Sequence, residues 1–155
     1  MVLVSPQASD DELLSIARGW IDVLAREDYS TVFATLGYAV RFDEPGPDAI
    51  RNAIKRYRSN EYFPDVDNFV VSDWRFAQGG NPDPYIRIKR FESNTLAIRC
   101  TIEMVLPLNG KWSDLEIDFV IFERESSNEW MFTLEDIVCT RQLQEEFEQA
   151  GTSAD

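Results

Sequence analysis

Two hydrophobic repeats divide the chain into a helical first part and an extended second part. Between residues 10 and 25 the apolar side chains recur every three or four positions, which is typical of an amphipathic helix. Ser9 stands before three acidic residues, and this order favours a helix start because carboxylates stabilise the positive end of the helix dipole. Shorter helices are predicted over residues 29–36 and 47–60, the latter opened by Pro47.

The polar face of the first predicted helix carries charged residues at a regular spacing. Arg18, Asp22 and Arg26 follow one another every four residues. Opposite charges four residues apart lie close together on a helix surface. We therefore expect ion pairs to run along this face.

From residue 68 onward the apolar positions alternate with polar ones, which is the pattern of half-buried strands. Five strands are predicted, over residues 69–77, 85–91, 95–106, 115–124 and 130–139. Asn109-Gly110 is a strong signal for a two-residue hairpin turn. A continuous hairpin around it sets Met104 opposite Leu115 and Glu103 opposite Glu116.

Two further hairpins, turning near residues 93–94 and 126–127, are consistent with the same inner face of the sheet. A slip of one residue would move every apolar side chain to the opposite face. The expected pairs are Ile88 with Cys100, Ile86 with Ile102, Ile121 with Phe132, and Phe119 with Leu134.

Helices followed by an antiparallel meander predict an α+β fold, with the N-terminal helices packed on one face of a curved antiparallel sheet. The length of 155 residues suggests one domain. We expect it to span residues 10–139, after an N-terminal extension at 1–9. Residues 140–155 are predicted to form a short C-terminal helix and a frayed tail.

Three helical segments and a long meander resemble the nuclear-transport-factor-two-like superfamily, a cystatin-like α+β fold shaped as a cone. The resemblance covers roughly residues 10–139 and includes the stretches 109–116 (NGKWSDLE) and 134–137 (LEDI). These stretches are similar to bacterial members with no established activity. The superfamily holds isomerases, dehydratases, transport adaptors and immunity proteins, so the resemblance implies a fold more than an activity.

Charge and composition exclude several functions. The chain has 28 acidic and 15 basic residues, a formal net charge of −13, and no histidine. Without histidine there is no Ser-His-Asp or Cys-His catalysis and no histidine-ligated zinc. The acidity argues against binding the phosphate backbone of a nucleic acid, so we expect no nucleic-acid partner.

The two cysteines predict a reducing compartment. Cys100 and Cys139 fall on strands that the predicted register separates by a third strand, too far apart for a disulfide. We expect two buried free thiols in a cytoplasmic protein. No apolar run approaches the length of a membrane span, and residues 1–10 lack the pattern of a signal peptide, so no membrane partner is expected.

Enzymes of the resembled superfamily act in the cone between the helices and the concave sheet face. Here the predicted lining of the cone is apolar and includes Trp20, Ile98, Cys100, Met104, Ile117 and Phe119. No catalytic residue is carried over from the superfamily, and neither a cofactor nor a metal is expected. The remaining catalytic candidates are Asp73, with a pKa raised beside aromatic rings, and Tyr38 and Tyr57. The cone is then either a filled core or a pocket for a small hydrophobic ligand, bound or turned over by an isomerase- or dehydratase-type enzyme.

The outer sheet face is expected to gather carboxylates from adjacent strands. The predicted face consists of Glu103, Glu116, Asp118 and Glu135, with Arg87 and Arg99 on its basic flank. Residues 103–155 hold 13 acidic and 3 basic residues, a net charge of −10, which suits a basic partner. This pattern favours a non-enzymatic protein-binding module, such as an immunity-type protein that neutralises a basic partner. A solvated face, or a homodimer through this face as the resemblance implies, explains the pattern as well.

Overall fold

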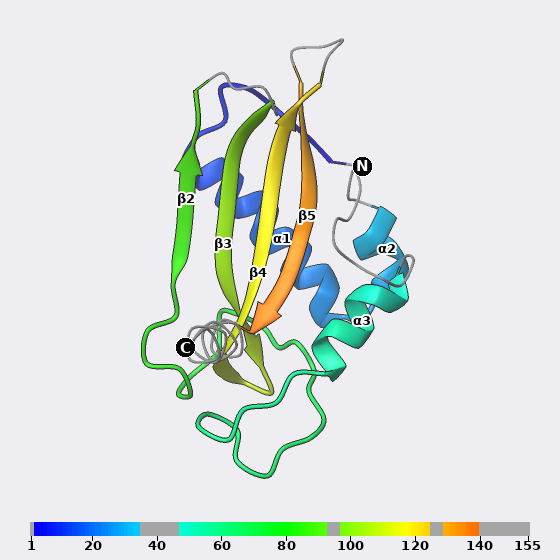
Figure 1. Cartoon of the computed structure of the whole chain (residues 1–155), viewed down its shortest axis with the longest axis vertical. Coiled ribbons are helices and arrows are strands. Elements are labelled where there is room, and N and C mark those ends of the chain that lie inside the picture. Colours follow the sequence, from blue (N-terminus) through cyan, green and yellow to red (C-terminus); the bar gives the residue numbers. More distant parts are fainter. Residues whose placement is uncertain (1, 35–46, 93–96, 125–128, 140–155) are drawn as a thin grey trace, which may run out of the picture.

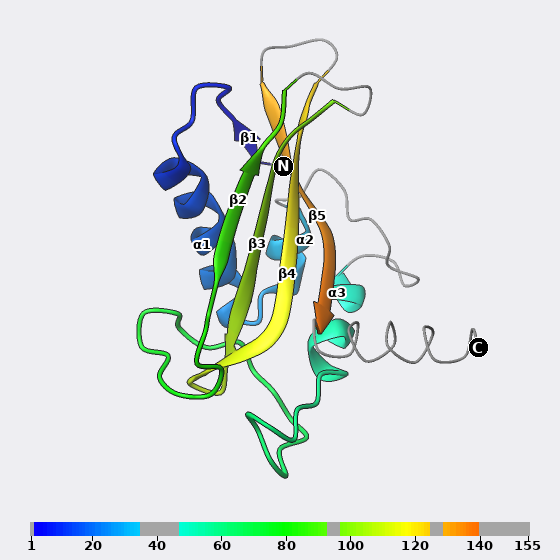
Figure 2. The same ribbon diagram turned by 60° about the vertical axis from the view of Figure 1, so that its left-hand side comes forward.

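The computed structural model describes residues 2–34, 47–92, 97–124 and 129–139. In these residues three helices pack on one face of a curled five-stranded antiparallel sheet (Figure 1). Figure 2, a view from the side, shows α1 to the left of the strands, α2 behind them and α3 beside the end of β5. This arrangement confirms the predicted α+β class. Tyr38, the predicted turns near residues 93–94 and 126–127, and residues 140–155 lie outside the described residues.

The helices begin where the sequence predicts. α1 spans Asp10–Ala25, α2 spans Tyr29–Ala34 and α3 spans Pro47–Lys55. The Ser9 hydroxyl accepts a hydrogen bond from the Glu12 amide at 3.2 Å, as an N-cap should. α3 is shorter than predicted, and the Arg58 guanidinium donates to the Lys55 carbonyl at 2.7 Å just past its end. None of the described helices has the length and hydropathy needed to cross a membrane.

The sheet has the order β1-β5-β4-β3-β2. Its strands are β1 (Leu3–Val4), β2 (Ile86–Arg90), β3 (Ile98–Leu108), β4 (Lys111–Glu123) and β5 (Trp130–Cys139). The fifth strand therefore comes from the N-terminus, where the sequence analysis placed no element.

The predicted strand at residues 69–77 is wrong. Only Val71 forms a bridge there, opposite Leu108, and residues 74–76 form a turn. The Asp73 carboxylate accepts a hydrogen bond from the Arg75 amide at 2.9 Å. Such a side-chain turn competes with a strand ladder, which explains why an alternating stretch does not become a strand.

The β3–β4 hairpin starts as predicted and then shifts by two residues. Leu108 lies opposite Lys111 across the Asn109-Gly110 turn, but Met104 lies opposite Ile117 and not opposite Leu115. A bulge causes the shift, because Leu106 alone faces residues 113–115. The even shift keeps Cys100, Ile102 and Met104 on their predicted face. A second shift, of one residue, sets Ile98 opposite Phe122, so its predicted place in the lining of the cone is wrong.

The register between β4 and β5 matches the prediction from Glu123 to Phe119, and then a bulge shifts it by one residue. Ile121 opposite Phe132 is confirmed, as is Phe119 opposite Leu134. Between β2 and β3 the pairing also differs by two residues, so Ile88 lies opposite Ile102. The predicted separation of the cysteines by one strand is confirmed, and both thiols are buried and free.

Aromatic rings fill the centre of the cone. Trp20 of α1 meets Phe119 of β4 edge to face at a centroid distance of 5.2 Å. Phe119 also stacks on Phe132 at 4.6 Å, and both phenylalanine rings are fully buried. Of the predicted cone lining, this part is core and not pocket.

We predict that Phe119→Ala lowers the free energy of unfolding by about 3–5 kcal/mol, because it removes ring contacts and leaves a cavity. Phe76→Ala is the matched control: this ring is 74% exposed in the turn, and its loss should change stability by less than about 0.5 kcal/mol. Urea denaturation of both variants measures the difference. Equal losses would contradict this assignment of the core.

Candidate functional site

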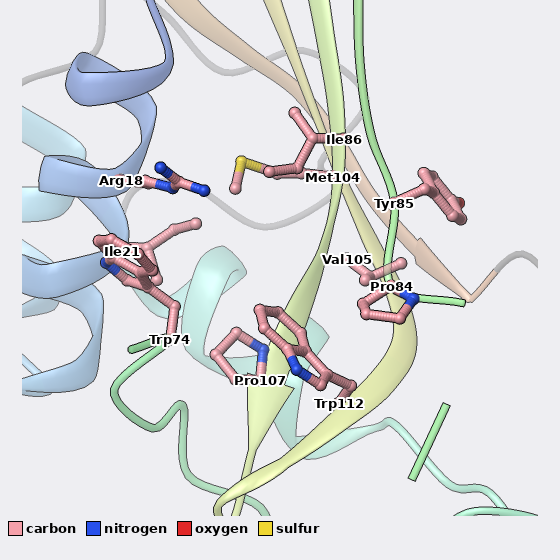
Figure 3. Close-up of a pocket in the computed structure, with 10 residues that line it drawn as sticks. All are labelled: Arg18, Ile21, Trp74, Pro84, Tyr85, Ile86, Met104, Val105, Pro107 and Trp112. Atoms are coloured by element: carbon pink, nitrogen blue, oxygen red, sulfur yellow. The ribbon is translucent and has the colours of Figure 1, made fainter. Parts of the chain in front are cut away.

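A partly enclosed cavity of about 200 Å³ lies between α1 and the edge of the sheet at β2 and β3 (Figure 3). Its walls come from α1, from the turn at residues 74–76, from the segment entering β2, and from both strands of the β3–β4 hairpin. The residues that line it are Arg18, Ile21, Trp74, Pro84, Tyr85, Ile86, Met104, Val105, Pro107 and Trp112. Met104 is the one predicted cone residue among them.

The loop before β2 is fixed against the hairpin and carries one wall of the cavity. The Asn81 amide donates to the Trp112 carbonyl at 2.8 Å, and the Trp112 amide donates to the Gly79 carbonyl at 3.0 Å. Gly80 approaches so closely that an added Cβ would lie 2.2 Å from the Trp112 carbonyl oxygen. Glycine is therefore required at position 80, and the close contact holds Pro84 beside Trp112.

The opposite wall is held by an ion pair between the turn and α1. Arg75 donates to both carboxylate oxygens of Asp22, at 2.9 and 3.0 Å. The Trp74 indole nitrogen donates to the same carboxylate at 3.1 Å. Asp22 therefore binds the turn and not Arg18 or Arg26, so the predicted ion pairs along the helix face are wrong. These hydrogen bonds also raise the pKa of Arg75, which stays charged.

Arg18 supplies the positive charge of the cavity. Its guanidinium carbon lies 4.2 Å from the centroid of the Trp74 ring, a cation–π contact. Figure 3 shows the guanidinium reaching from α1 towards Met104 on the opposite wall. Among the described residues no carboxylate forms an ion pair with Arg18, because Asp22 is bound by Arg75. The cavity thus combines apolar walls with one cation that has no counter-ion there.

The predicted catalytic candidates do not form one site. Asp73 accepts hydrogen bonds from the backbone and the side chain of Arg75, which lower its pKa, so the predicted raised pKa is wrong. Tyr57 lies elsewhere and donates its hydroxyl proton to the buried carboxylate of Asp114. Burial and that hydrogen bond raise the pKa of Tyr57. Tyr57 thus connects the segment after α3 to β4.

The outer face of the sheet gathers carboxylates, as predicted. Glu103 lies opposite Asp118, which corrects the predicted pairing of Glu103 with Glu116. A bulge in β5 inserts Glu135 beside Asp118, because Asp118 lies opposite Asp136 while Phe119 lies opposite Leu134. The buried Glu116 carboxylate accepts a hydrogen bond from the Tyr85 hydroxyl.

The two basic residues predicted to flank this face form ion pairs with two different glutamates. Arg87 lies 3.7 Å from the Glu103 carboxylate, at the edge of the cluster. Arg99 forms an ion pair with Glu123, away from the cluster. We define the acidic face as the four carboxylates of Glu103, Glu116, Asp118 and Glu135. Within the described residues, no group of three or more His, Cys, Asp or Glu has the arrangement of a metal site.

Asp118 is the member of the acidic face whose carboxyl group is least favourably placed for ionisation. Burial raises the pKa of its carboxyl group from 3.8 to about 8, helped by a hydrogen bond with Glu116 and by the charges of Glu116, Glu103 and Glu135. Its Oδ1 atom is buried and has no hydrogen-bond partner in the described structure. The cluster therefore retains a proton at neutral pH.

Comparisons with family models, with curated proteins and with solved structures return no match for this chain.

Sequence reasoning missed Arg18, Trp74 and Trp112 as members of one site. No local pattern marks them, because the cavity is created by contacts between α1, the turn and the hairpin. Trp112 lies in the stretch 109–116 that carries the family resemblance, which gives it no predicted role in a site. Arg18 was assigned to a solvent-exposed ion-pair ladder, and only the capture of its expected partner by Arg75 leaves it available.

We predict that Asp118→Asn makes the protein more stable at high pH. The raised pKa means that the folded state binds a proton which the unfolded state releases near pH 4, so native stability falls as pH rises from about 4 to about 8. Asparagine keeps the shape without ionising. Because the group is only partly buried, we expect a gain of about 1–2 kcal/mol at pH 9 and little change at pH 4.

Asp73→Asn is the matched control for that measurement. The pKa of Asp73 is lowered, so its stabilising effect is lost only as pH falls through the acidic range. Its difference from wild type should be constant between pH 5 and 9. Urea denaturation across this range checks both variants, and a flat profile for Asp118→Asn would contradict the shared proton.

Proposed function

We propose that this protein binds a small, largely apolar molecule in the cavity between α1 and the β2–β3 edge. The observation that carries the proposal is the combination of a preformed cavity of about 200 Å³ with one inward cation. Binding sites for small molecules are typically concave and apolar, with a few polar groups that fix orientation. The lining has this composition.

The size of the cavity limits the ligand. An apolar cavity of about 150 Å³ is enough to hold benzene, whereas sites for drug-sized molecules begin at about 300 Å³. A volume of about 200 Å³ suits one ring or a short branched chain with one polar group. Nucleotides and other large cofactors are too big for it.

The lining favours binding over acid–base chemistry. Its ionisable side chains are Arg18 and Tyr85, and arginine stays protonated. The Tyr85 hydroxyl donates to Glu116 on the outer face, on the side of the strand away from Arg18. The assignment of the chain to the nuclear-transport-factor-two-like superfamily stays a prediction, and the proposal does not depend on it.

We predict that Ile86→Trp weakens ligand binding by about tenfold or more, because an indole at this wall occupies ligand volume. Ile86 is 40% exposed at the mouth of the cavity, so the larger side chain fits without overpacking the core. Leu3→Trp is the matched control, since Leu3 is 39% exposed on β1 at the other edge of the sheet. Titration with benzamide, a neutral ring, followed by the Met104 methyl signal in NMR, measures both. Undiminished binding in Ile86→Trp, or no response of Met104 in the wild type, would count against the cavity.

A second function is favoured by the acidic face. Burial and the other three carboxylates keep Asp118 protonated, so positive charge brought there by a protein partner would relieve repulsion and allow Asp118 to ionise. We propose a basic protein as this partner. A homodimer through the same face would instead place like charges opposite each other, which costs stability.

We predict that Glu103→Gln/Glu135→Gln loses basic proteins that the wild type retains from a host lysate at low salt. High salt should release the same proteins from the wild type, because screening weakens attraction between exposed charges. Asp11→Asn/Glu12→Gln removes equal charge from α1 and should leave retention unchanged. Mass spectrometry of the bound fractions gives the result. Equal retention by both double variants, or a salt-independent dimer in size-exclusion chromatography, would contradict a basic protein partner at this face.

A further inference from the structure

We infer that the ligand of the cavity is a compact monocarboxylate, an apolar ring or short branched chain whose carboxylate binds the guanidinium of Arg18. This inference rests on the proposed function and specifies its ligand class. Its basis is the geometry around α1, where two acids and two arginines lie close together and only one arginine faces the cavity.

The cavity presents one charged side chain, that of Arg18. Asp22 is held by both terminal nitrogens of Arg75, and Asp73 accepts from the same guanidinium at 3.1 Å. Both carboxylates are thus bound by Arg75, and none of these three residues lines the cavity. Among the residues that line the cavity Arg18 alone carries a charge, so an anion bound there would meet one cation and no carboxylate of the lining.

The guanidinium of Arg18 limits the shape of the anion that it can bind. A guanidinium presents parallel N–H donors that match the two oxygens of a carboxylate. The contact between Arg18 and the Trp74 ring, at 4.2 Å, limits the orientations of that fork. Trp74 is itself fixed by its hydrogen bond to Asp22. A donor group oriented in advance loses less entropy on binding, so this arrangement favours a carboxylate over a neutral amide of the same shape.

The remaining walls of the cavity determine which apolar group the ligand can carry. Facing Arg18 are Met104, Pro107 and Trp112, which offer apolar surface and a flexible thioether. These walls suit the ring or chain of the ligand. An ammonium compound would meet the Arg18 cation and no carboxylate, so the site should reject it.

The test compares three probes of nearly equal shape: benzoate, benzamide and benzylamine. Binding to the full chain is followed by the Trp74 and Trp112 indole signals in NMR. We expect benzoate to bind about tenfold or more tightly than benzamide, and benzylamine to bind least. Arg18→Gln should remove the preference for benzoate, so that benzoate and benzamide bind with similar affinity. Arg26→Gln, which removes the same charge just beyond the end of α1, should keep the preference.

The outcomes separate the two proposals. Equal affinity for benzoate and benzamide in the wild type, or a preference that survives Arg18→Gln, would overturn the carboxylate inference while the cavity remains a binding site. No indole response to any probe would overturn the proposed function as well. Wild-type positions of the Trp74 and Trp112 indole signals without any probe show that Arg18→Gln is folded. If it fails to fold, Arg18→Lys keeps the charge without the fork, and it should keep benzoate ahead of benzamide by a smaller factor.

Discussion

The bulge in the β3–β4 hairpin is the constraint on which both candidate sites depend. Leu106 alone faces residues 113–115, and the Ser113 hydroxyl donates to the Leu106 carbonyl at 2.6 Å. The same hydroxyl accepts from the Leu115 amide at 3.0 Å, so the bulge satisfies its own polar groups. By moving the register two residues it sets Asp118 opposite Glu103. On the turn side of the bulge Pro107 pairs with Trp112, and both residues line the cavity.

The distribution of charge follows from this geometry. Carboxylates that an unbulged hairpin would distribute differently converge around Asp118, and the cost of their repulsion is reduced by one retained proton. On the other side of the same strands, Met104 and its neighbours keep the inner face apolar. The single cation facing them, Arg18, comes from α1 and not from the sheet. Local arrangements that cost stability are typical of functional sites, because a fold optimised for stability alone would remove them.

Strong periodicity made the regular elements predictable, and long-range contacts decided the rest. α1 and the pairs Ile121–Phe132 and Phe119–Leu134 follow from alternation, capping and the burial of one face. β1 has two residues, too few for any periodic signal. Residues 69–77 alternate like a strand, but the side chain of Asp73 closes a turn there.

Of the candidate sites, the acidic face could be predicted because the two-residue shift in the β3–β4 hairpin keeps Glu103, Glu116 and Asp118 on one face. Glu135 joins them through a one-residue bulge in β5. The cavity could not be predicted, since the contact that defines it is the capture of Asp22 by Arg75 across 53 positions of sequence. The sequence spacing predicts ion pairs of Asp22 with Arg18 and Arg26, which lie four positions away on either side. The structure shows that a bidentate contact with a distant arginine competes successfully with those local pairs, each of which is worth only about 0.2–0.5 kcal/mol on a helix surface.

The two candidate functions share strands but not side chains. Neighbouring residues of a strand point to opposite faces, so Met104 faces the cavity while Glu103 belongs to the acidic face. Two residues are exceptions: Tyr85 borders the cavity while its hydroxyl donates to Glu116, and Val105 borders the cavity although it lies opposite Glu116. Substitutions at Arg18 or Ile86 therefore leave the carboxylates in place, and substitutions at Glu103 or Glu135 leave the cavity intact. A variant of Tyr85 would disturb both faces, so it could not separate ligand binding from protein binding.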